Sequence, residues 1–155
     1  MSSLHDAIYA FTAALPPARK AWQSAAGTAL ASSGLSVSVA TPVLLVSRMG
    51  DGVFQHVLAE RIGVHPAALV RTLDQAEKAD LLERRLVPGN RRIRAIHLLP
   101  AGRRVAKKLE KAVKSLRDSL LQDLPEADIA TAARVLRIFE ERARQHAEQV
   151  RANSA

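Results

Sequence analysis

Four arginines give this sequence its clearest capacity for chemistry. Arg91, Arg92 and Arg94 follow directly after the tripeptide Pro88-Gly89-Asn90. Arg71 lies in a separate stretch with helical spacing of its apolar residues. Guanidinium groups bind phosphate through charge-assisted hydrogen bonds, and they bind guanine through two parallel ones. The expected chemistry is recognition of a polyanion, with nucleic acid as the first candidate.

Catalytic and metal-binding patterns are absent from the sequence. The chain has no cysteine, which excludes a disulfide framework, a thiolate metal site and cysteine-based sensing of peroxide. There is no glycine-rich phosphate loop and no serine in a nucleophile motif. The histidines have no ligand spacing with one another or with nearby carboxylates; they are His5, His56, His65, His97 and His146. We therefore expect no enzyme activity, no cofactor and no metal site.

Two short helices must position Arg71. Residues 53–62 carry apolar side chains along one helical face, and residues 66–79 do the same. Gly63 can end the first helix in a left-handed conformation, and Pro66 suits the first position of the second. Asp80 tolerates the left-handed backbone that would end the second helix. Two helices joined by so short a turn predict a helix-turn-helix.

A β-hairpin must position the other three arginines. Residues 81–87 and 93–98 predict two strands on either side of the Pro88-Gly89-Asn90 turn. Strand alternation would place Arg92 and Arg94 on one face and Arg91 on the other. We expect Arg91 or Arg92 to enter a DNA minor groove.

Longer helices are expected on both sides of this region. At the N-terminal end, Pro16-Pro17 should separate a helix over residues 4–15 from one over 18–32, and Pro42 should kink the next helix or mark its start after Thr41. At the C-terminal end, residues 101–121 form a long apolar stripe, and a capped, acidic start at Asp123, Pro125 and Glu126 leads into another helix.

These C-terminal stripes are too apolar to face water, and they predict a homodimer. The alternative is a helical hairpin folded back against the chain's own core. The residues expected at the dimer interface are Leu109, Val113, Leu116, Leu120, Ile129, Leu136 and Phe139.

Five segments in order resemble the multiple antibiotic resistance regulator (MarR) family: Leu58–Val64, Leu69–Asp74, Leu81–Arg85, Asn90–Arg92 and Pro100–Gly102. With Gly34-Leu35-Ser36 upstream, the resemblance covers about residues 17–150. It implies a mainly α fold in a single domain over residues 1–155. A winged helix-turn-helix lobe with a two-stranded β-wing would span residues 36–99, and residues 1–35 and 100–155 would form helical dimerisation regions.

The resemblance implies a bacterial transcriptional regulator that binds double-stranded DNA. A two-fold dimer would place its recognition helices in the major groove about one turn apart, on a palindromic operator. The residues expected to contact DNA are Gln55, Pro66, Ala67, Ala68, Val70, Arg71, Gln75, Arg91, Arg92 and Arg94. For Arg71, an ion pair or hydrogen bond with Asp74 or Gln75 is the alternative. A winged-helix module for protein assembly and a non-specific DNA-binding protein remain the alternative functions.

Two departures from the family pattern bear on DNA binding. Asn90 stands where the family usually has an Asp that braces the second following arginine, here Arg92, and an amide offers no charge pair. His65 and Ala67 stand where Asp and Ser are common, so we expect a helix N-cap and a phosphate-binding hydroxyl to be lost.

The resemblance also implies a site for a small aromatic or phenolic acid between the dimerisation helices and the winged-helix lobe. By position, Tyr9, Trp22, Arg48 and Met49 could line it. Otherwise Tyr9 and Trp22 belong to the core and Arg48 is a surface or interface charge.

Positive charge is concentrated in one segment. Residues 84–117 contain twelve lysines and arginines and only Glu110 as an acid, so the segment carries +11 and the remainder −3, for a net charge of +8. A solvated helix face explains Lys107, Lys108, Lys111 and Lys114 as well as phosphate binding does, whereas the hairpin arginines favour phosphate. No apolar run is long enough to span a membrane and no secretory signal is present, so we expect a cytoplasmic protein.

Overall fold

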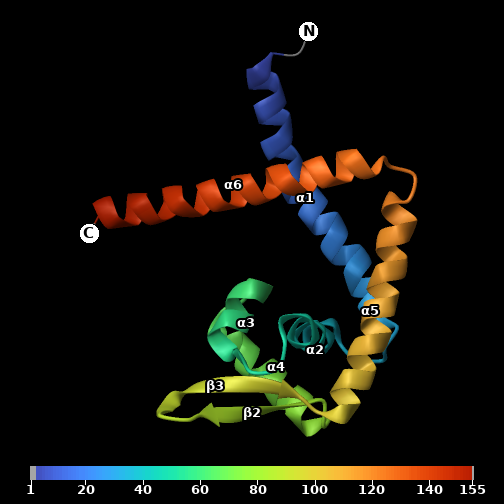
Figure 1. Ribbon diagram of the computed structural model, residues 1–155, viewed down its shortest axis with the longest axis vertical. Helices are drawn as coiled ribbons and strands as arrows, with labels where there is room; N and C mark the ends of the chain where they lie inside the picture. Colours follow the sequence, from blue (N-terminus) through green and yellow to red (C-terminus); the bar gives the residue numbers. More distant parts are fainter. Residues whose placement is uncertain (1–2, 155) are drawn as a thin grey trace. The chain divides into compact units, whose positions relative to one another are not determined.

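The computed structural model describes residues 3–154 of the chain. They divide into two compact units, Met1–Arg117 and Asp118–Ala155. The helices are α1 (Leu4–Ala31), α2 (Val37–Met49), α3 (Gln55–Ile62), α4 (Pro66–Lys78), α5 (Pro100–Leu121) and α6 (Glu126–Asn153), and the strands are β1 (Val53–Phe54), β2 (Leu82–Val87) and β3 (Asn90–Leu98) (Figure 1). The predicted mainly α fold with a winged helix-turn-helix is confirmed.

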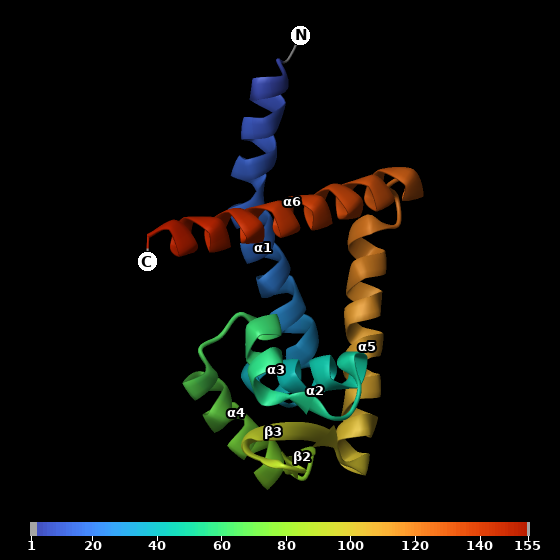
Figure 2. The ribbon, with the colours of Figure 1, turned by 60° about the vertical axis from the view of Figure 1, so that its left-hand side comes forward.

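The sheet of the first unit has three antiparallel strands in the order β1-β3-β2, one more than predicted. Figure 2 shows β3 leading into the start of α5. Val53 and Phe54 pair with Ile96 and Ala95, and the Gly52 N–H donates to the Ile96 carbonyl over 2.8 Å. The sequence pattern placed both residues in the first helix of the helix-turn-helix. That assignment was wrong because a two-residue strand is too short to show a period of its own.

Prolines interrupt neither N-terminal helix. Helix α1 is continuous through Pro16 and Pro17, and α2 begins at Val37, five residues before Pro42, rather than after Thr41. A proline ring holds φ near the helical value, so each proline removes one backbone hydrogen bond without forcing the helix to end. The residues around Pro16 and Pro17 are exposed, so water can hydrate the carbonyls left without a donor.

The core of the first unit lies between α2, α4, the sheet and the first half of α5. Its fully buried side chains include Val43, Val46, Leu58, Leu69, Leu73, Leu82, Ile96 and Leu109. Leu109 and Val113, both expected at a dimer interface, are only 1% and 3% exposed in this core. That expectation is corrected for these two residues, because both belong to the chain's own hydrophobic core.

Helix α5 approaches the backbone at the start of β2 very closely. A Cβ built on the buried Gly102 would lie 1.8 Å from the Leu81 carbonyl oxygen. Glycine is therefore required at this position for the helix to pack against the sheet. This close approach explains why a glycine stands at position 102, the last residue of the Pro100–Gly102 segment.

The second unit consists of the end of α5 and helix α6. None of the residues of α6 is buried, and several are large and apolar: Val135, Leu136, Ile138, Phe139 and Val150 are each at least 36% exposed. The first turn is acidic as predicted, with Glu126 and Asp128, but the N-cap residue is Pro125 and no side chain caps the helix. Within residues 3–154, no helix is both long and apolar enough to cross a membrane.

Candidate nucleic-acid interface

Three residues join α3 to α4 and set the start of the second helix. Gly63 adopts the left-handed conformation (φ 79°) that ends α3, as predicted. His65 is the N-cap of α4, and its ring Nδ1 accepts a hydrogen bond from the Ala67 N–H over 3.2 Å. The expected loss of a side-chain cap is therefore wrong, because an imidazole nitrogen takes the place of a carboxylate or hydroxyl oxygen. With Nδ1 as the acceptor, the neutral ring carries its proton on Nε2.

Helix α4 buries one face and exposes the other. Leu69, Leu73 and Ala76 are buried against the core. The face predicted to contact DNA is exposed: Pro66, Ala67, Ala68, Val70, Arg71 and Gln75. Gln55, the remaining helical residue predicted at the interface, is half-buried in the first turn of α3.

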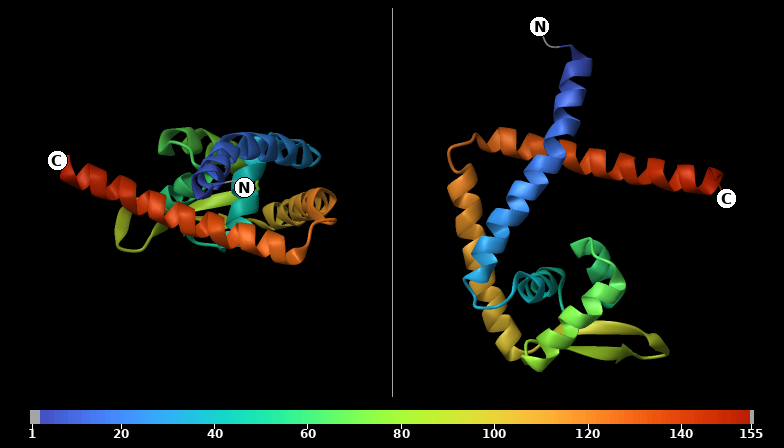
Figure 3. Two further views of the ribbon diagram at one scale, coloured as in Figure 1. Left: turned by 90° about the horizontal axis from the view of Figure 1, so that it is seen from above. Right: turned by 180° about the vertical axis from the view of Figure 1, so that it is seen from behind.

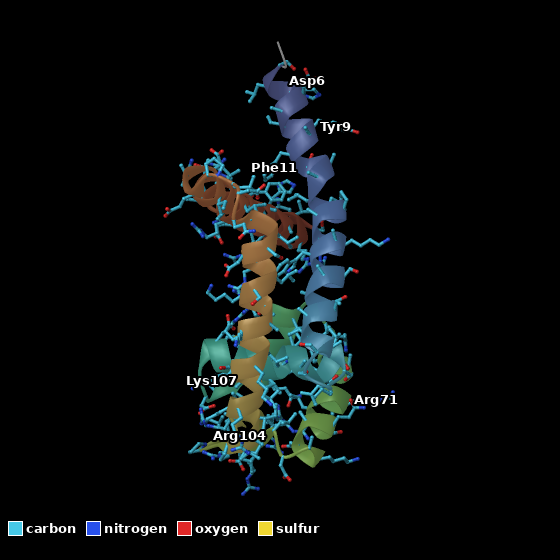
Figure 4. All side chains as sticks on the ribbon, turned by 90° about the vertical axis from the view of Figure 1, so that its right-hand side faces the viewer. Asp6, Tyr9, Phe11, Arg71, Arg104 and Lys107 are labelled. Carbon is cyan, nitrogen blue, oxygen red and sulfur yellow. The ribbon has the colours of Figure 1, made fainter. Side chains whose placement is uncertain are left out.

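Arg71 is available for a ligand. Its side chain points away from the body of α4 into solvent (Figure 4). Within residues 3–154 it makes no hydrogen bond or ion pair, so the alternative of a pair with Asp74 or Gln75 is not observed.

A three-residue ionic network fixes α4 on the sheet. The Arg84 guanidinium, on β2, forms ion pairs with Asp74 and Glu77 of α4, and its Nη2 donates to Glu77 Oε2 over 2.5 Å. The Arg84 N–H also donates to Glu77 Oε1 over 2.8 Å. The hydrogen bond from the Arg84 side chain is the main reason that the pKa of Glu77 lies below its ordinary value. Sequence reasoning counted Arg84 only as a positive charge; the three-residue spacing of Asp74 and Glu77 was the signal that could have found the network.

The β2–β3 hairpin forms the wing, which projects beyond α3 and α4 (Figures 1 and 3). Val87 pairs with Asn90 across a turn at Pro88-Gly89, whereas the preceding pair is Leu86 with Arg94. This shift in register leaves residues 91–93 outside the regular ladder. The predicted alternation of Arg91, Arg92 and Arg94 between two faces therefore does not apply at the tip.

Arg91 and Arg92 are exposed at this tip, and neither side chain has a hydrogen bond or ion pair within residues 3–154. Asn90 Oδ1 accepts a hydrogen bond from the Arg92 backbone N–H over 3.0 Å, so the amide braces the backbone of Arg92 rather than its guanidinium. Arg94 Nη1 donates to the Arg91 carbonyl over 3.2 Å.

Asp51 ties the base of the wing to α5. Its Oδ1 accepts the Leu98 N–H over 2.9 Å, and its other oxygen pairs with Arg103. The Leu98 N–H is the largest cause that holds the pKa of Asp51 below its ordinary value. Arg103 is thus neutralised by Asp51, as Arg85 is by Glu83.

A cavity of about 470 Å³ lies between α1, α2, the α3–α4 turn and α5. Of the four residues predicted to line a ligand site, Trp22 and Arg48 line this cavity. Tyr9 is 71% exposed on α1 and Met49 is 39% exposed at the end of α2, and neither contributes to the lining. Arg48 Nε donates to Glu110 Oε2 over 2.8 Å, and this bond is the main cause that lowers the pKa of Glu110.

No group of three or more His, Asp or Glu side chains within residues 3–154 is placed to hold a metal ion.

An exposed helix after a three-residue turn, beside an arginine-bearing hairpin, defines the first unit as a winged helix-turn-helix. A MarR family model matches residues 33–93. The crystal structure of the transcriptional regulator PA3341 is 29% identical, with 86% of this chain and 98% of that chain covered and a TM-score of 0.77. A MarR family regulator from Rhodococcus sp. RHA1 is 25% identical, with 88% and 94% covered and a TM-score of 0.70. A mutant MarR from E. coli, in complex with operator DNA, is 19% identical over 89% and 99% of the two chains, with a TM-score of 0.70. The family-model match and these structures support classification of the chain with the MarR family.

Proposed function

We propose that this protein is a transcriptional regulator that binds a palindromic DNA operator as a homodimer. The observation that carries the proposal is the presence of an exposed α4 face and an arginine-tipped wing in one compact unit. The E. coli MarR structure with operator DNA supports this assignment, because the same fold engages DNA there.

Helix α4 would lie in the major groove. Among the α4 residues predicted to contact DNA, Arg71 is the only one that can form two parallel hydrogen bonds to guanine, and it is not engaged elsewhere within residues 3–154. Ala67, Ala68 and Val70 offer apolar surface to thymine methyl groups. The Nε2–H of His65 lies beside the start of the helix, where a donor to a phosphate replaces the missing hydroxyl at Ala67.

The wing would lie in the minor groove. Arg91 and Arg92 are exposed at its tip, and a narrow A·T-rich minor groove concentrates negative potential. These contacts are insensitive to most of the base sequence, so they supply affinity more than discrimination.

Dimerisation would cover the apolar residues that the chain leaves in water. Leu120, Leu136 and Phe139 are 51%, 43% and 38% exposed, and Leu4 and Ile8 of α1 are 78% and 55% exposed. Leu116 and Ile129 are half-buried and complete the set of predicted interface residues that the core does not absorb. Exposed apolar surface on this scale is typical of an interaction site.

Selection of duplexes from a random library at near-physiological salt tests the proposal. We expect enrichment of a motif with two half-sites about one helical turn apart. Arg71→Ala should change the preferred sequence and cost about 1–3 kcal/mol, whereas Arg92→Ala should weaken binding to all duplexes. Salt-sensitive binding without enrichment would indicate a non-specific DNA-binding protein, and no binding would favour a protein-assembly module.

The cavity beside Trp22 and Arg48 supports regulation by a small aromatic acid. An aromatic ring could stack near Trp22, and Arg48 could bind its carboxylate if it released Glu110. A thermal-shift screen of aromatic and phenolic acids tests this part separately. A lack of stabilisation by every compound would contradict it without affecting DNA binding.

A further inference from the structure

Four cations form a continuous stripe along the first half of α5. Arg104, Lys107, Lys108 and Lys111 follow one another at spacings of three, one and three residues, which places them on one side of the helix. All four are exposed, and the opposite side of the helix is buried through Ala106, Leu109 and Val113. We call these four residues the α5 basic stripe; Figure 4 looks onto the helix with Arg104 near its start and Lys107 further along.

The stripe differs from four other cations of the basic segment in having no counter-charge. Arg84, Arg85, Arg103 and Arg117 are each paired with a carboxylate. No member of the stripe has an ion pair within residues 3–154. Glu110, the one acid in the segment, is bound by Arg48 and Arg117.

The arrangement is unfavourable for the isolated helix. Like charges three or four residues apart destabilise a helix, and the stripe contains four such pairs, Arg104 with Lys107 and with Lys108, and Lys111 with Lys107 and with Lys108. An anionic surface along the helix would remove this repulsion. A row of unpaired cations at helical spacing is therefore better explained by a polyanionic partner than by solvation alone.

We propose that the α5 basic stripe binds the DNA backbone outside the contacts of α4 and the wing. The inference rests on the proposed function. DNA is favoured over a lipid surface because no large apolar side chain is exposed between Val87 and Ser119 in the described chain, and an interfacial helix needs such side chains for insertion. The stripe also starts six residues after β3, on the same compact unit as the wing.

The test is the salt dependence of DNA binding by a variant in which Arg104, Lys107, Lys108 and Lys111 are all replaced by Gln. The duplexes are the selected motif, extended by several helical turns on each side, and a scrambled sequence of the same length. Each phosphate contact contributes about 0.9 to the slope of log K against log salt concentration. We expect the slope to become shallower by at least about 1.8, equivalent to two contacts, with at least tenfold weaker binding on both duplexes.

Two control variants separate this result from loss of folding or of net charge. Arg134, Arg137, Arg142 and Arg151 of α6, replaced together by Gln, remove the same total charge and should leave the slope unchanged. Replacement of Lys107, Lys108 and Lys111 by Arg keeps the charge and should also keep the slope. The Gln variant of the stripe should melt no lower than the wild type, because the repulsion is relieved.

The possible failures are distinguishable. If the wild type binds DNA and Arg92→Ala weakens it, an unchanged slope in the stripe variant overturns the stripe alone. An unchanged slope with loss of binding to anionic vesicles would assign the stripe to lipid and also overturn the proposal. If the wild type binds no duplex, both the stripe and the proposed function are wrong.

Discussion

The ionic network between β2 and α4 makes a quantitative prediction. Replacement of Arg84 by Ala removes the guanidinium from two carboxylates, whose side chains are 31% exposed at Glu77 and 46% exposed at Asp74. A hydrogen bond to a charged group contributes about 1.5–3 kcal/mol, and a pair exposed to the extent of Asp74 contributes about 0–1 kcal/mol. We expect Arg84→Ala to lower the free energy of unfolding by about 2 kcal/mol, which lowers Tm by roughly 4–8 °C for a chain of this size.

A double-mutant cycle isolates the interaction itself. Urea unfolding of the wild type, Arg84→Ala, Glu77→Gln and the double variant gives the coupling between the two side chains, which we expect to be about 1–1.5 kcal/mol. All four proteins must be compared at one concentration, because association changes apparent stability. Arg85→Ala is the matched control: its pair with Glu83 is 58% and 40% exposed, and it should cost less than about 0.5 kcal/mol.

The network also predicts a dependence on pH. The pKa of Glu77 is lowered in the folded chain, so its contribution is complete above the ordinary value of 4.5 and is lost as the pH falls through the lower folded value. Glu77→Gln should therefore reduce the loss of stability in acid.

In the double-mutant cycle, a coupling energy between Arg84 and Glu77 within about 0.3 kcal/mol of zero, the usual error of additivity, would refute the view that these side chains hold α4 on the sheet.

Three further predictions concern packing, acid stability and capping. Gly102→Ala should lower the free energy of unfolding by about 3 kcal/mol or more in thermal unfolding, because the new Cβ would collide with the Leu81 carbonyl. Gly27→Ala is the control and should be neutral or stabilising, because its Cβ would meet only a methyl group at 3.7 Å. Equal effects of the two substitutions would contradict the close approach. Asp51→Asn should lower the free energy of unfolding by about 1 kcal/mol at pH 7 and should have no effect well below pH 3.8. The reason is that the pKa of the carboxyl is lower in the folded chain, so its stabilising effect is lost as it becomes protonated. An effect that persists in acid would show that the carboxylate charge is not the cause. His65→Ala should lower the free energy of unfolding by about 1 kcal/mol, whereas His65→Asn should retain most of the wild-type stability, because Asn is a good N-cap. Identical stabilities of these two variants would show that the ring nitrogen does not cap α4.

Local signals were sufficient to predict the helix-turn-helix. Gly63 and Pro66 end one helix and begin the next through backbone preferences that need no tertiary information, and Asp80 adopts the expected positive φ of 55°. The two-residue strand β1 could not be predicted in this way. It exists only because Val53 and Phe54 lie beside a strand more than forty residues further along the chain.

The candidate site was predictable where exposure decides the role of a residue. The exposed face of α4 follows from its helical period, so the position of Arg71 was correct. The partners of Arg84 depend on how β2 crosses α4, which the sequence does not state. The apolar stripe on α5 shows a similar limit. It contains Leu109, which is buried within the chain, and Leu120, which is exposed. The helical period predicts that a face is apolar, but it does not say whether the same chain or a partner covers that face.

Residues of α4 that pack against the rest of the unit and residues that face outward lie on opposite sides of the helix, and this separation affects how the binding specificity of such a protein can change during evolution. The side chains that hold the helix in place, Leu69, Leu73 and Glu77, occupy one side, and those that face outward, such as Val70 and Arg71, occupy the other. Substitutions on the outward side remove no buried contact and break no ion pair, so they should be close to neutral for folding. Duplicated copies of this gene could therefore acquire new binding preferences one residue at a time, with each intermediate still folded.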